Sequence, residues 1–273
     1  MKKIIFYFIL GLLILPACQD DDQNVNPDGT CLVQKMKTDF TGEILFDYDN
    51  DGTLISIAEE NFNMKVKFQY DDKKRISKME YYNFSGDSLT GYANIEWTDD
   101  QTVMSESFFF DYNGNPWLAS KEKTELNDKG YPVKYSSYEK NENDEWYVDN
   151  YSEMTWDNDN LLQVDNYNLE PESGEYYLSK LVTYSYDTQK NPWYFQPAKI
   201  LFNNFIDFPI TKNNPVNCTE TMVETGYSRT TVWEYQYNDA GFPSSYVQKI
   251  ANTLTGEIIQ IKEVSSIQYA GCK

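Results

Sequence analysis

The chain has 273 residues, of which 40% are hydrophobic and 16% aromatic, so it carries enough apolar material for a folded core. Its 23 basic residues stand against 43 acidic ones, a formal net charge of −20 that disfavours binding to nucleic acid or anionic lipid headgroups. The sequence contains no histidine, which excludes Ser-His-Asp and Cys-His centres and histidine-ligated zinc; among common catalytic devices, paired carboxylates remain.

Residues 1–17 have the pattern of a secretory signal. Lys2 and Lys3 supply a basic start, and an apolar run over residues 4–15 follows. This run is shorter than the roughly twenty residues that a membrane-spanning helix needs. A buried core helix is the alternative, but the run stops at Pro16 before a cluster of acidic residues.

The motif LPAC at residues 15–18 resembles a bacterial lipobox, in which the cysteine carries a diacylglycerol and begins the mature chain. The QDDD run behind it resembles the export signal of surface lipoproteins in Bacteroidota. These resemblances imply lipidation at Cys18 and an outer-membrane location facing the cell surface. Residues 18–30 are polar and aperiodic, as in a flexible tether, and residues 31–273 are expected to form a single all-β domain.

Three further cysteines are Cys31, Cys218 and Cys272. An exported protein can form disulfides, and an odd number of cysteines leaves one thiol free or paired with another molecule. Cys31 starts the expected domain and Cys272 nearly ends it. If the first and last strands lie side by side, these two can bridge; we favour this pair, with a disulfide that includes Cys218 as the alternative.

One motif recurs seven times from residue 46 onward. An apolar residue, usually aromatic, is followed by Asp, Asn or Thr, then by polar or glycine residues, and then by apolar residues again. The copies are FDYDNDGTLISI (46–57), FQYDDKKRISKM (68–79), IEWTDDQTVMSE (95–106), TELNDKGYPVKY (124–135), MTWDNDNLLQVD (154–165), YSYDTQKNPWYF (184–195) and YQYNDAGFPSSY (235–246). Their anchors are Tyr48, Tyr70, Trp97, Leu126, Trp156, Tyr186 and Tyr237, spaced by about 22 to 30 residues with one gap of about 51.

Each copy predicts a β-hairpin. In MKVKFQY, residues 64–70, apolar and polar residues alternate, as in a strand with one face toward a core. Asp and Asn then favour a tight turn, Gly supplies positive φ, and a second strand follows. The copies together predict an all-β fold: a large antiparallel up-and-down meander of about 14 strands, as a rolled sheet or a soluble barrel.

The first copy also resembles the start of a calcium loop. A loop of the EF-hand type that begins at Asp47 requires a glutamate at its twelfth position, where this chain has Ala58. The hairpin turn is therefore favoured, and no metal or other cofactor is expected.

The copies resemble YD/RHS-type repeats. With the lipobox motif, they are similar to uncharacterised lipoproteins of Bacteroidota with a DUF4595-type domain of unknown function. The segments YSYDTQKNPWYFQPAKILFNN, TKNNPV and WEYQYNDAGFPSSY carry most of the resemblance, which would span about residues 31 to 272. It implies a porin-like fold and no known activity, although the uneven spacing differs from a regular YD array.

Such a barrel is expected to stand in water rather than to cross the membrane. The strands are short, and MKVKF and WEYQY place Lys or Glu on outward faces, where a lipid-facing strand requires apolar residues. The lipid at Cys18 would then be the only membrane contact.

The long gap between copies holds FQPAKILFNNFIDFPITKNNP, residues 195–215. A short helix is expected over residues 198–205, after Pro197. The apolar content of this insertion indicates a plug over one end of the barrel, and a ligand lid is the alternative.

Three tryptophans are candidate aromatic binding residues. Trp117 and Trp193 each follow an Asn-Pro pair, and Trp146 lies in the polar stretch NENDEWY. Exposed at loop tips, they would stack on sugars; alternatively, each folds back to anchor its turn. Asp87-Ser88-Leu89 resembles the short O-glycosylation acceptor of this bacterial group, which implies modification at Ser88.

No catalytic residue can be assigned from this sequence. It predicts a surface-tethered lipoprotein that serves as a non-catalytic binding or structural module for a glycan or a protein partner, with no nucleic acid partner. One alternative is a carboxylate-based polysaccharide hydrolase, which requires two carboxylates roughly 5 to 9.5 Å apart across a cleft. Another is an accessory subunit of an outer-membrane complex.

Overall fold

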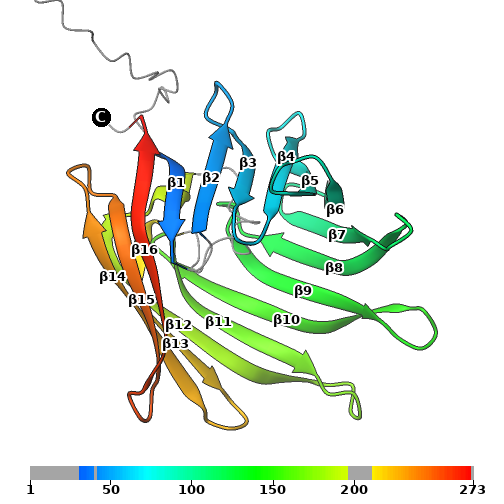
Figure 1. Cartoon of the computed structure of the whole chain (residues 1–273). Helices are drawn as coiled ribbons and strands as arrows, with labels where there is room; N and C mark the ends of the chain where they lie inside the picture. Colours follow the sequence, from blue (N-terminus) through cyan, green and yellow to red (C-terminus); the bar gives the residue numbers. More distant parts are fainter. Residues whose placement is uncertain (1–30, 40–41, 196–210, 272–273) are drawn as a thin grey trace, which may run out of the picture.

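The structure is a computed structural model, which describes residues 31–39, 42–195 and 211–271. Sixteen antiparallel strands follow one another in chain order and close into a barrel through the pairing of β1 with β16 (Figure 1). One 3-10 turn, η1 (Pro192–Phe195), precedes β13. The strands are β1 (Leu32–Thr38), β2 (Gly42–Tyr48), β3 (Leu54–Glu59), β4 (Met64–Tyr70), β5 (Ile76–Asn83), β6 (Leu89–Trp97), β7 (Thr102–Phe110), β8 (Pro116–Leu126), β9 (Pro132–Lys140), β10 (Trp146–Asp157), β11 (Asn160–Leu169), β12 (Tyr176–Lys190), β13 (Asn213–Met222), β14 (Ser228–Tyr237), β15 (Pro243–Asn252) and β16 (Ile258–Ala270).

The predicted all-β, up-and-down class is confirmed, and the sheet closes into a barrel. The strand number is 16 rather than about 14. Both β1 and β16 lie outside the repeat copies, and the sixth copy is not a hairpin, because η1 separates β12 from its partner β13. The helix predicted over residues 198–205 lies outside the described residues. The described residues contain no helix long and apolar enough to cross a membrane.

The aromatic anchors tie each hairpin to the one before it. The Tyr48 hydroxyl donates to the Val33 carbonyl at 2.8 Å, and the Tyr70 hydroxyl donates to the Leu54 carbonyl at 2.6 Å. Each bond therefore joins the end of one strand to the start of an earlier one. The same bond runs from Trp97 to Ile76, Trp156 to Pro132, Tyr186 to Leu161, Tyr235 to Pro215 and Tyr269 to Pro243.

Two copies depart from this rule. Leu126 has no side-chain donor, and its backbone amide donates to the Gln101 carbonyl at 2.8 Å. In the last copy, the bond to the carbonyl comes from Tyr235, two positions before the predicted anchor. Tyr237 instead donates its hydroxyl to the Asp187 carboxylate.

The acidic and amide residues after the anchors close the turns. Asp49 Oδ1 accepts from the amides of Asp51 at 2.9 Å and Thr53 at 2.8 Å, and Gly52 has φ 77°. This is the three-residue hairpin loop in which a type I turn is followed by a left-handed residue. The first copy is thus a hairpin turn. Similar side-chain bonds recur after the anchors at Asp71, Asn127 and Asn238, and in turns at the opposite end at Asp111 and Asn141.

One cluster of buried apolar side chains identifies the inside of the barrel. It includes Val33 of β1, Val66 of β4, Val182 of β12 and Val264 of β16, which only the lumen can bring together. Trp193 of η1 belongs to this cluster; it is 1% exposed, and its ring centroid lies 5.0 Å from that of Phe46. The end of the barrel that carries the anchors is therefore closed by apolar packing.

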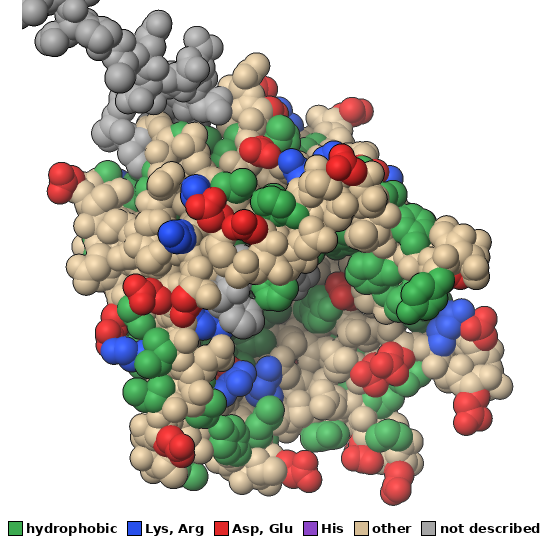
Figure 2. Space-filling view, in the orientation of Figure 1, with side chains coloured by type: hydrophobic (Ala, Val, Ile, Leu, Met, Phe, Trp, Pro, Cys, Tyr) green, Lys and Arg blue, Asp and Glu red, His purple; other side chains and the backbone are tan. Residues whose placement is uncertain are grey.

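At the opposite end, the residues that the structure describes leave the lumen open. The strands of one side are short and those of the other are long, from six residues in β3 to fifteen in β12. In Figure 1, the long strands extend well past β1 to β5, and Figure 2 shows a hollow between them. A barrel of this strand number has a lumen wider than its wall side chains can fill.

The outer face carries ion pairs. Cross-strand partners share a face of the sheet, so residues that alternate with the core positions point outward. On β7 and β8, Lys121 lies 2.8 Å from Glu106 on this outer face. Further outer pairs are Lys35–Glu43 and Lys249–Glu234 at 2.6 Å and Lys78–Glu80 at 2.9 Å.

We expect Tyr70→Phe to destabilise the barrel, because it removes the hydroxyl that bonds to the Leu54 carbonyl but keeps the ring. The loss in free energy of unfolding should be about 1 to 2 kcal/mol, measured by urea denaturation. Burial raises the pKa of Tyr70, so the hydroxyl keeps its proton as a donor at neutral pH. The control is Tyr112→Phe, at a fully exposed hairpin tip, where the change should stay within about 0.5 kcal/mol. Equal losses in the two variants would contradict the anchor role.

Candidate functional site

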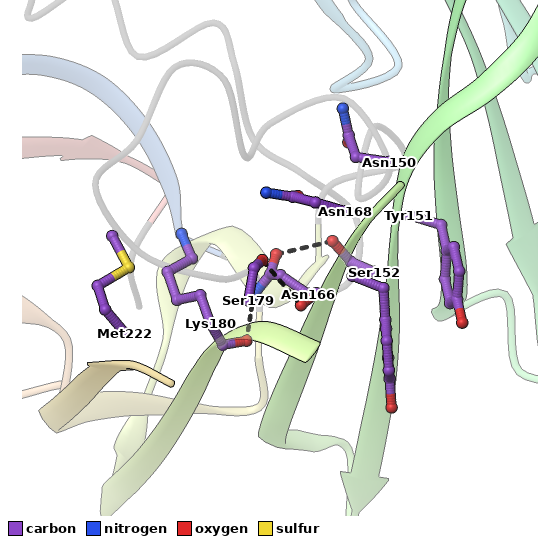
Figure 3. A pocket seen from close by; sticks show the side chains of 9 residues that line it. Asn150, Tyr151, Ser152, Asn166, Asn168, Ser179, Lys180 and Met222 are labelled. Atoms are coloured by element: carbon purple, nitrogen blue, oxygen red, sulfur yellow. Dashed lines mark hydrogen bonds between the residues drawn. The ribbon is translucent and has the colours of Figure 1, made fainter. Parts of the chain in front are cut away.

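A pocket of about 280 Å³ lies on the inner face of β10 to β13. In Figure 3, the side chains of Asn150, Asn168 and Lys180 point to one side of the sheet, and that of Tyr151 points away from them. Amides and hydroxyls dominate the lining, which consists of Asn150, Tyr151, Ser152, Asn166, Tyr167, Asn168, Ser179, Lys180 and Met222.

A row of directly paired residues links this pocket to the core. The polar row, as we name it, runs across seven strands from β6 to β12. Its first member, Ile95, belongs to the buried cluster, and paired residues share a face, so the amides of the row point into the lumen. Along this row, the inward side chains change from apolar to hydrogen-bonding. The members of the row are Ile95, Ser105, Glu122, Ser137, Asn150, Asn168 and Tyr177.

Asn166 is held in place by its neighbours. The Ser152 hydroxyl donates to Asn166 Oδ1 at 2.8 Å, and Asn166 Nδ2 donates to the Lys180 carbonyl at 3.2 Å. The Ser179 hydroxyl donates to the Asn166 carbonyl at 3.0 Å. Asn168 differs: its side chain is exposed to the lumen and has no hydrogen bond to any residue that the structure describes. Its amide is therefore available to a ligand.

Two cations near the pocket, Arg229 and Lys180, share the single carboxylate of Glu220. Arg229 Nε and a terminal guanidinium nitrogen each donate to the Glu220 carboxylate at 3.0 Å, and Lys180 Nζ lies 3.9 Å from it. The hydrogen bonds that Arg229 donates to the Glu220 carboxylate raise the pKa of Arg229. Glu220 thus offsets one of the two positive charges, and the Lys180 ammonium group remains part of the pocket lining.

Acidic residues are absent from the pocket lining that the structure describes, so a pair of catalytic carboxylates does not converge there. Likewise, within the described ranges, no group of three or more Cys, Asp or Glu side chains is arranged to hold a metal ion. The chemistry that the pocket offers is hydrogen bonding, mainly by neutral amides and hydroxyls and also by the Lys180 ammonium group.

The three candidate tryptophans occupy three different environments. Trp193 is 1% exposed within the core, where a ligand cannot reach it. Trp146 is 38% exposed on the outer face, with Lys121 and Lys140 over its ring at 5.3 and 5.2 Å. Trp117 is 53% exposed and pairs with Phe109 on the inner face of β8. Only Trp117 of these three is both exposed and in the lumen.

The pocket residues were not among the sequence candidates, although the signal exists in the stretches NYS (150–152) and NYN (166–168). Each has a tyrosine between polar residues, and alternation alone favours the tyrosine as the inward residue. In the structure, Tyr151 and Tyr167 stack on the outer face with ring centroids 4.7 Å apart, and the polar residues face the lumen. The tyrosines therefore point outward and the polar residues inward, which is the reverse of what alternation alone favours.

The remaining candidate residues are Ser88 and the cysteines. Ser88 is exposed between β5 and β6, and its amide donates to Asn83 Oδ1 at 3.2 Å; its modification stays a prediction. Leu32 pairs with Ala270, so the first and last strands do lie side by side. The Cys31–Cys272 disulfide stays a prediction because Cys272, like Cys18, lies outside the described residues. Cys218 is free and buried.

No family model and no curated protein matches the chain. Among solved structures, it is similar to a porin-like protein from Bacteroides vulgatus, at 12% identity over 87% of this chain and 98% of that chain, with a TM-score of 0.42. A porin-like protein from Bacteroides uniformis is 14% identical over 87% of this chain and 96% of that chain, with a TM-score of 0.34. A protein of unknown function from Bacteroides fragilis is 13% identical over 44% of this chain and 93% of that chain, with a TM-score of 0.36.

We expect stability to fall at alkaline pH. Burial raises the pKa of the Cys218 thiol from its ordinary value near 9 to about 12. The folded state therefore holds a proton that the unfolded state releases, so this contribution is complete below about pH 9 and is lost as the pH rises toward about 12. Burial also raises the pKa of Tyr184, which acts in the same direction.

Urea unfolding at pH 7, 9, 10 and 11 measures this effect. Cys218→Ala should make the decline shallower, by at most about 1.4 kcal/mol per pH unit for one proton. An identical decline in wild type and variant would show that Cys218 does not titrate in this way.

Proposed function

We propose that the protein is a non-catalytic binding module that takes a neutral glycan into the open half of its barrel. The observation that carries this proposal is the pocket on β10 to β13, whose polar lining consists mainly of amides and hydroxyls. Such groups match the paired donor and acceptor character of sugar hydroxyls. The net charge of −20 opposes polyanions, and Glu220 offsets part of the positive charge of Lys180 and Arg229.

A protein partner is the second candidate, favoured by exposed apolar side chains at two hairpin tips. The Thr253 amide donates to the Ser228 carbonyl at 3.0 Å, so the tip after β15 adjoins the start of β14. Neighbouring exposed apolar side chains commonly mark contacts between proteins. Such a contact surface would also suit an accessory subunit of an outer-membrane complex. The residues are Val223, Tyr227, Leu254, Ile258 and Ile259.

We further propose that a lipid at Cys18 tethers the protein to the outer membrane, facing the cell surface, and that the barrel wall stands in water. The LPAC motif and the acidic run behind it support the tether. The ion pairs of the outer face support the solvated wall, because one lysine at the centre of a bilayer costs a barrel about 2 to 4 kcal/mol.

Native affinity electrophoresis tests the glycan proposal. The gels contain a soluble β-glucan, an α-mannan or a galactomannan, with polygalacturonate as the anionic comparison. We expect retardation by at least one neutral polysaccharide and none by polygalacturonate. Asn168→Ala should weaken that binding about 2- to 10-fold, as expected for one lost neutral hydrogen bond.

The matched control is Asn143→Ala, at the exposed turn between β9 and β10, which should bind as wild type does. If no neutral polysaccharide retards the wild-type protein, the proposed function is wrong.

Replacing Cys18 by Ala tests the tether. We expect the wild-type protein to enter the detergent phase on Triton X-114 partitioning, because an acyl chain contributes about 0.8 kcal/mol per buried methylene group. The variant should remain in the aqueous phase. Detergent partitioning that persists in Cys18→Ala would mean that the protein contacts the membrane by another route.

A further inference from the structure

A second row of paired residues crosses the inner face of β2 to β8. It begins in the closed core, where Phe46 contacts Trp193 and Val66 is fully buried. It ends at Phe109 and Trp117, which are 40% and 53% exposed. Since paired residues share a face, both of these aromatic rings face the open part of the lumen. The row is Phe46, Ile57, Val66, Tyr81, Gly91, Phe109 and Trp117.

Gly91 makes room for an aromatic surface in this row. A Cβ at Gly91 would lie 2.6 Å from Phe109 Cδ1 and 2.6 Å from the Phe108 carbonyl oxygen. The side chain of any other residue at position 91 would therefore overlap the Phe109 ring. The centroid of this ring lies 5.9 Å from that of Tyr81 and 6.2 Å from that of Trp117. We call these three rings, Tyr81, Phe109 and Trp117, the lumen platform.

Polar groups border the lumen platform on the same face. Ser107 pairs with Ser120 in the next row of β7 and β8, toward the closed end. Ser105 pairs with Glu122 in the row after that, and the Ser105 hydroxyl donates to Glu122 Oε2 at 3.3 Å. Glu122 also belongs to the polar row, which continues to Asn168 in the pocket. A continuous inner wall thus joins the platform to the pocket.

This combination selects one kind of ligand. Exposed aromatic faces bind flat apolar surfaces, such as the C–H face of a pyranose ring or a nucleobase. The carboxylate of Glu122 and the net charge of −20 disfavour a ligand that carries phosphates. The carboxylate and the serine hydroxyls instead suit the hydroxyls at the edge of a neutral sugar.

We propose that the lumen platform is a stacking subsite for a pyranose ring of a neutral glycan, with Trp117 and Phe109 as its contact residues. This inference rests on the proposed function and extends it, because the glycan would contact both the lumen platform and the pocket at Asn168. The exposed edge of the platform supplies the apolar contact that the pocket lacks.

Three variants test the subsite in affinity gels with the same β-glucan, α-mannan and galactomannan. Trp117→Ala should lower the affinity for the neutral polysaccharide about tenfold or more, because it removes the stacking contact and its buried area. Trp117→Phe, which keeps an aromatic face, should retain most of the affinity. Trp146→Ala is the matched control: it removes a partly exposed tryptophan from the outer face and should leave binding unchanged.

Gly91→Ala is an independent variant, because its new methyl group should displace the Phe109 ring and weaken binding while both aromatic residues remain. Thermal unfolding of each variant shows whether the fold survives, and Trp117→Ala, at an exposed position, should melt as wild type does. If Asn168→Ala weakens binding and Trp117→Ala does not, the stacking subsite is wrong and the proposed function stands. If the wild-type protein binds no neutral polysaccharide, both are wrong.

Discussion

A barrel of 16 strands encloses more space than the side chains of its own wall can fill. The two ends of the barrel differ in how this space is occupied. At the anchor end, apolar side chains from around the wall meet Trp193 of η1, and the lumen is closed. At the other end, the long strands extend beyond this core, and among the residues that the structure describes their inner face is exposed and polar. The candidate site lies on this exposed inner face.

The stabilising anchor bonds and the proposed binding surface are consequently separated along the barrel axis. The bonds from Tyr48, Tyr70 and the other anchors to backbone carbonyls all lie at the closed end, beside the turns that Asp and Asn residues close. The pocket and the lumen platform lie on the extensions beyond them. Rows of paired residues connect the two regions: one begins at Ile95 and another at Phe46, and both end in the open lumen. A rigid closed end can thereby hold the proposed binding surface in a fixed geometry.

Much of the fold could be predicted because each hairpin is specified locally. The anchors, the turn residues and the alternation over 64–70 all lie within one copy and needed no distant contact. The exceptions depend on distant segments. The sixth copy is not a hairpin, because β12 is followed by η1, whose Trp193 packs into the core of the barrel. Tyr235 is the anchor of the last copy, and the Tyr237 hydroxyl donates instead to Asp187, which is far away in sequence.

By itself, the sequence determined the antiparallel strands, their turns, the acidic surface and the absence of histidine chemistry. Only the tertiary structure decided which face of each strand is inside, because alternation distinguishes two faces without saying which one meets the core. Tyr151 and Tyr167 show this, since they stack outward while Asn150 and Asn168 line the lumen. Closure of β1 on β16 sets the inside, and the width of that closed barrel decides which inner residues stay in contact with water.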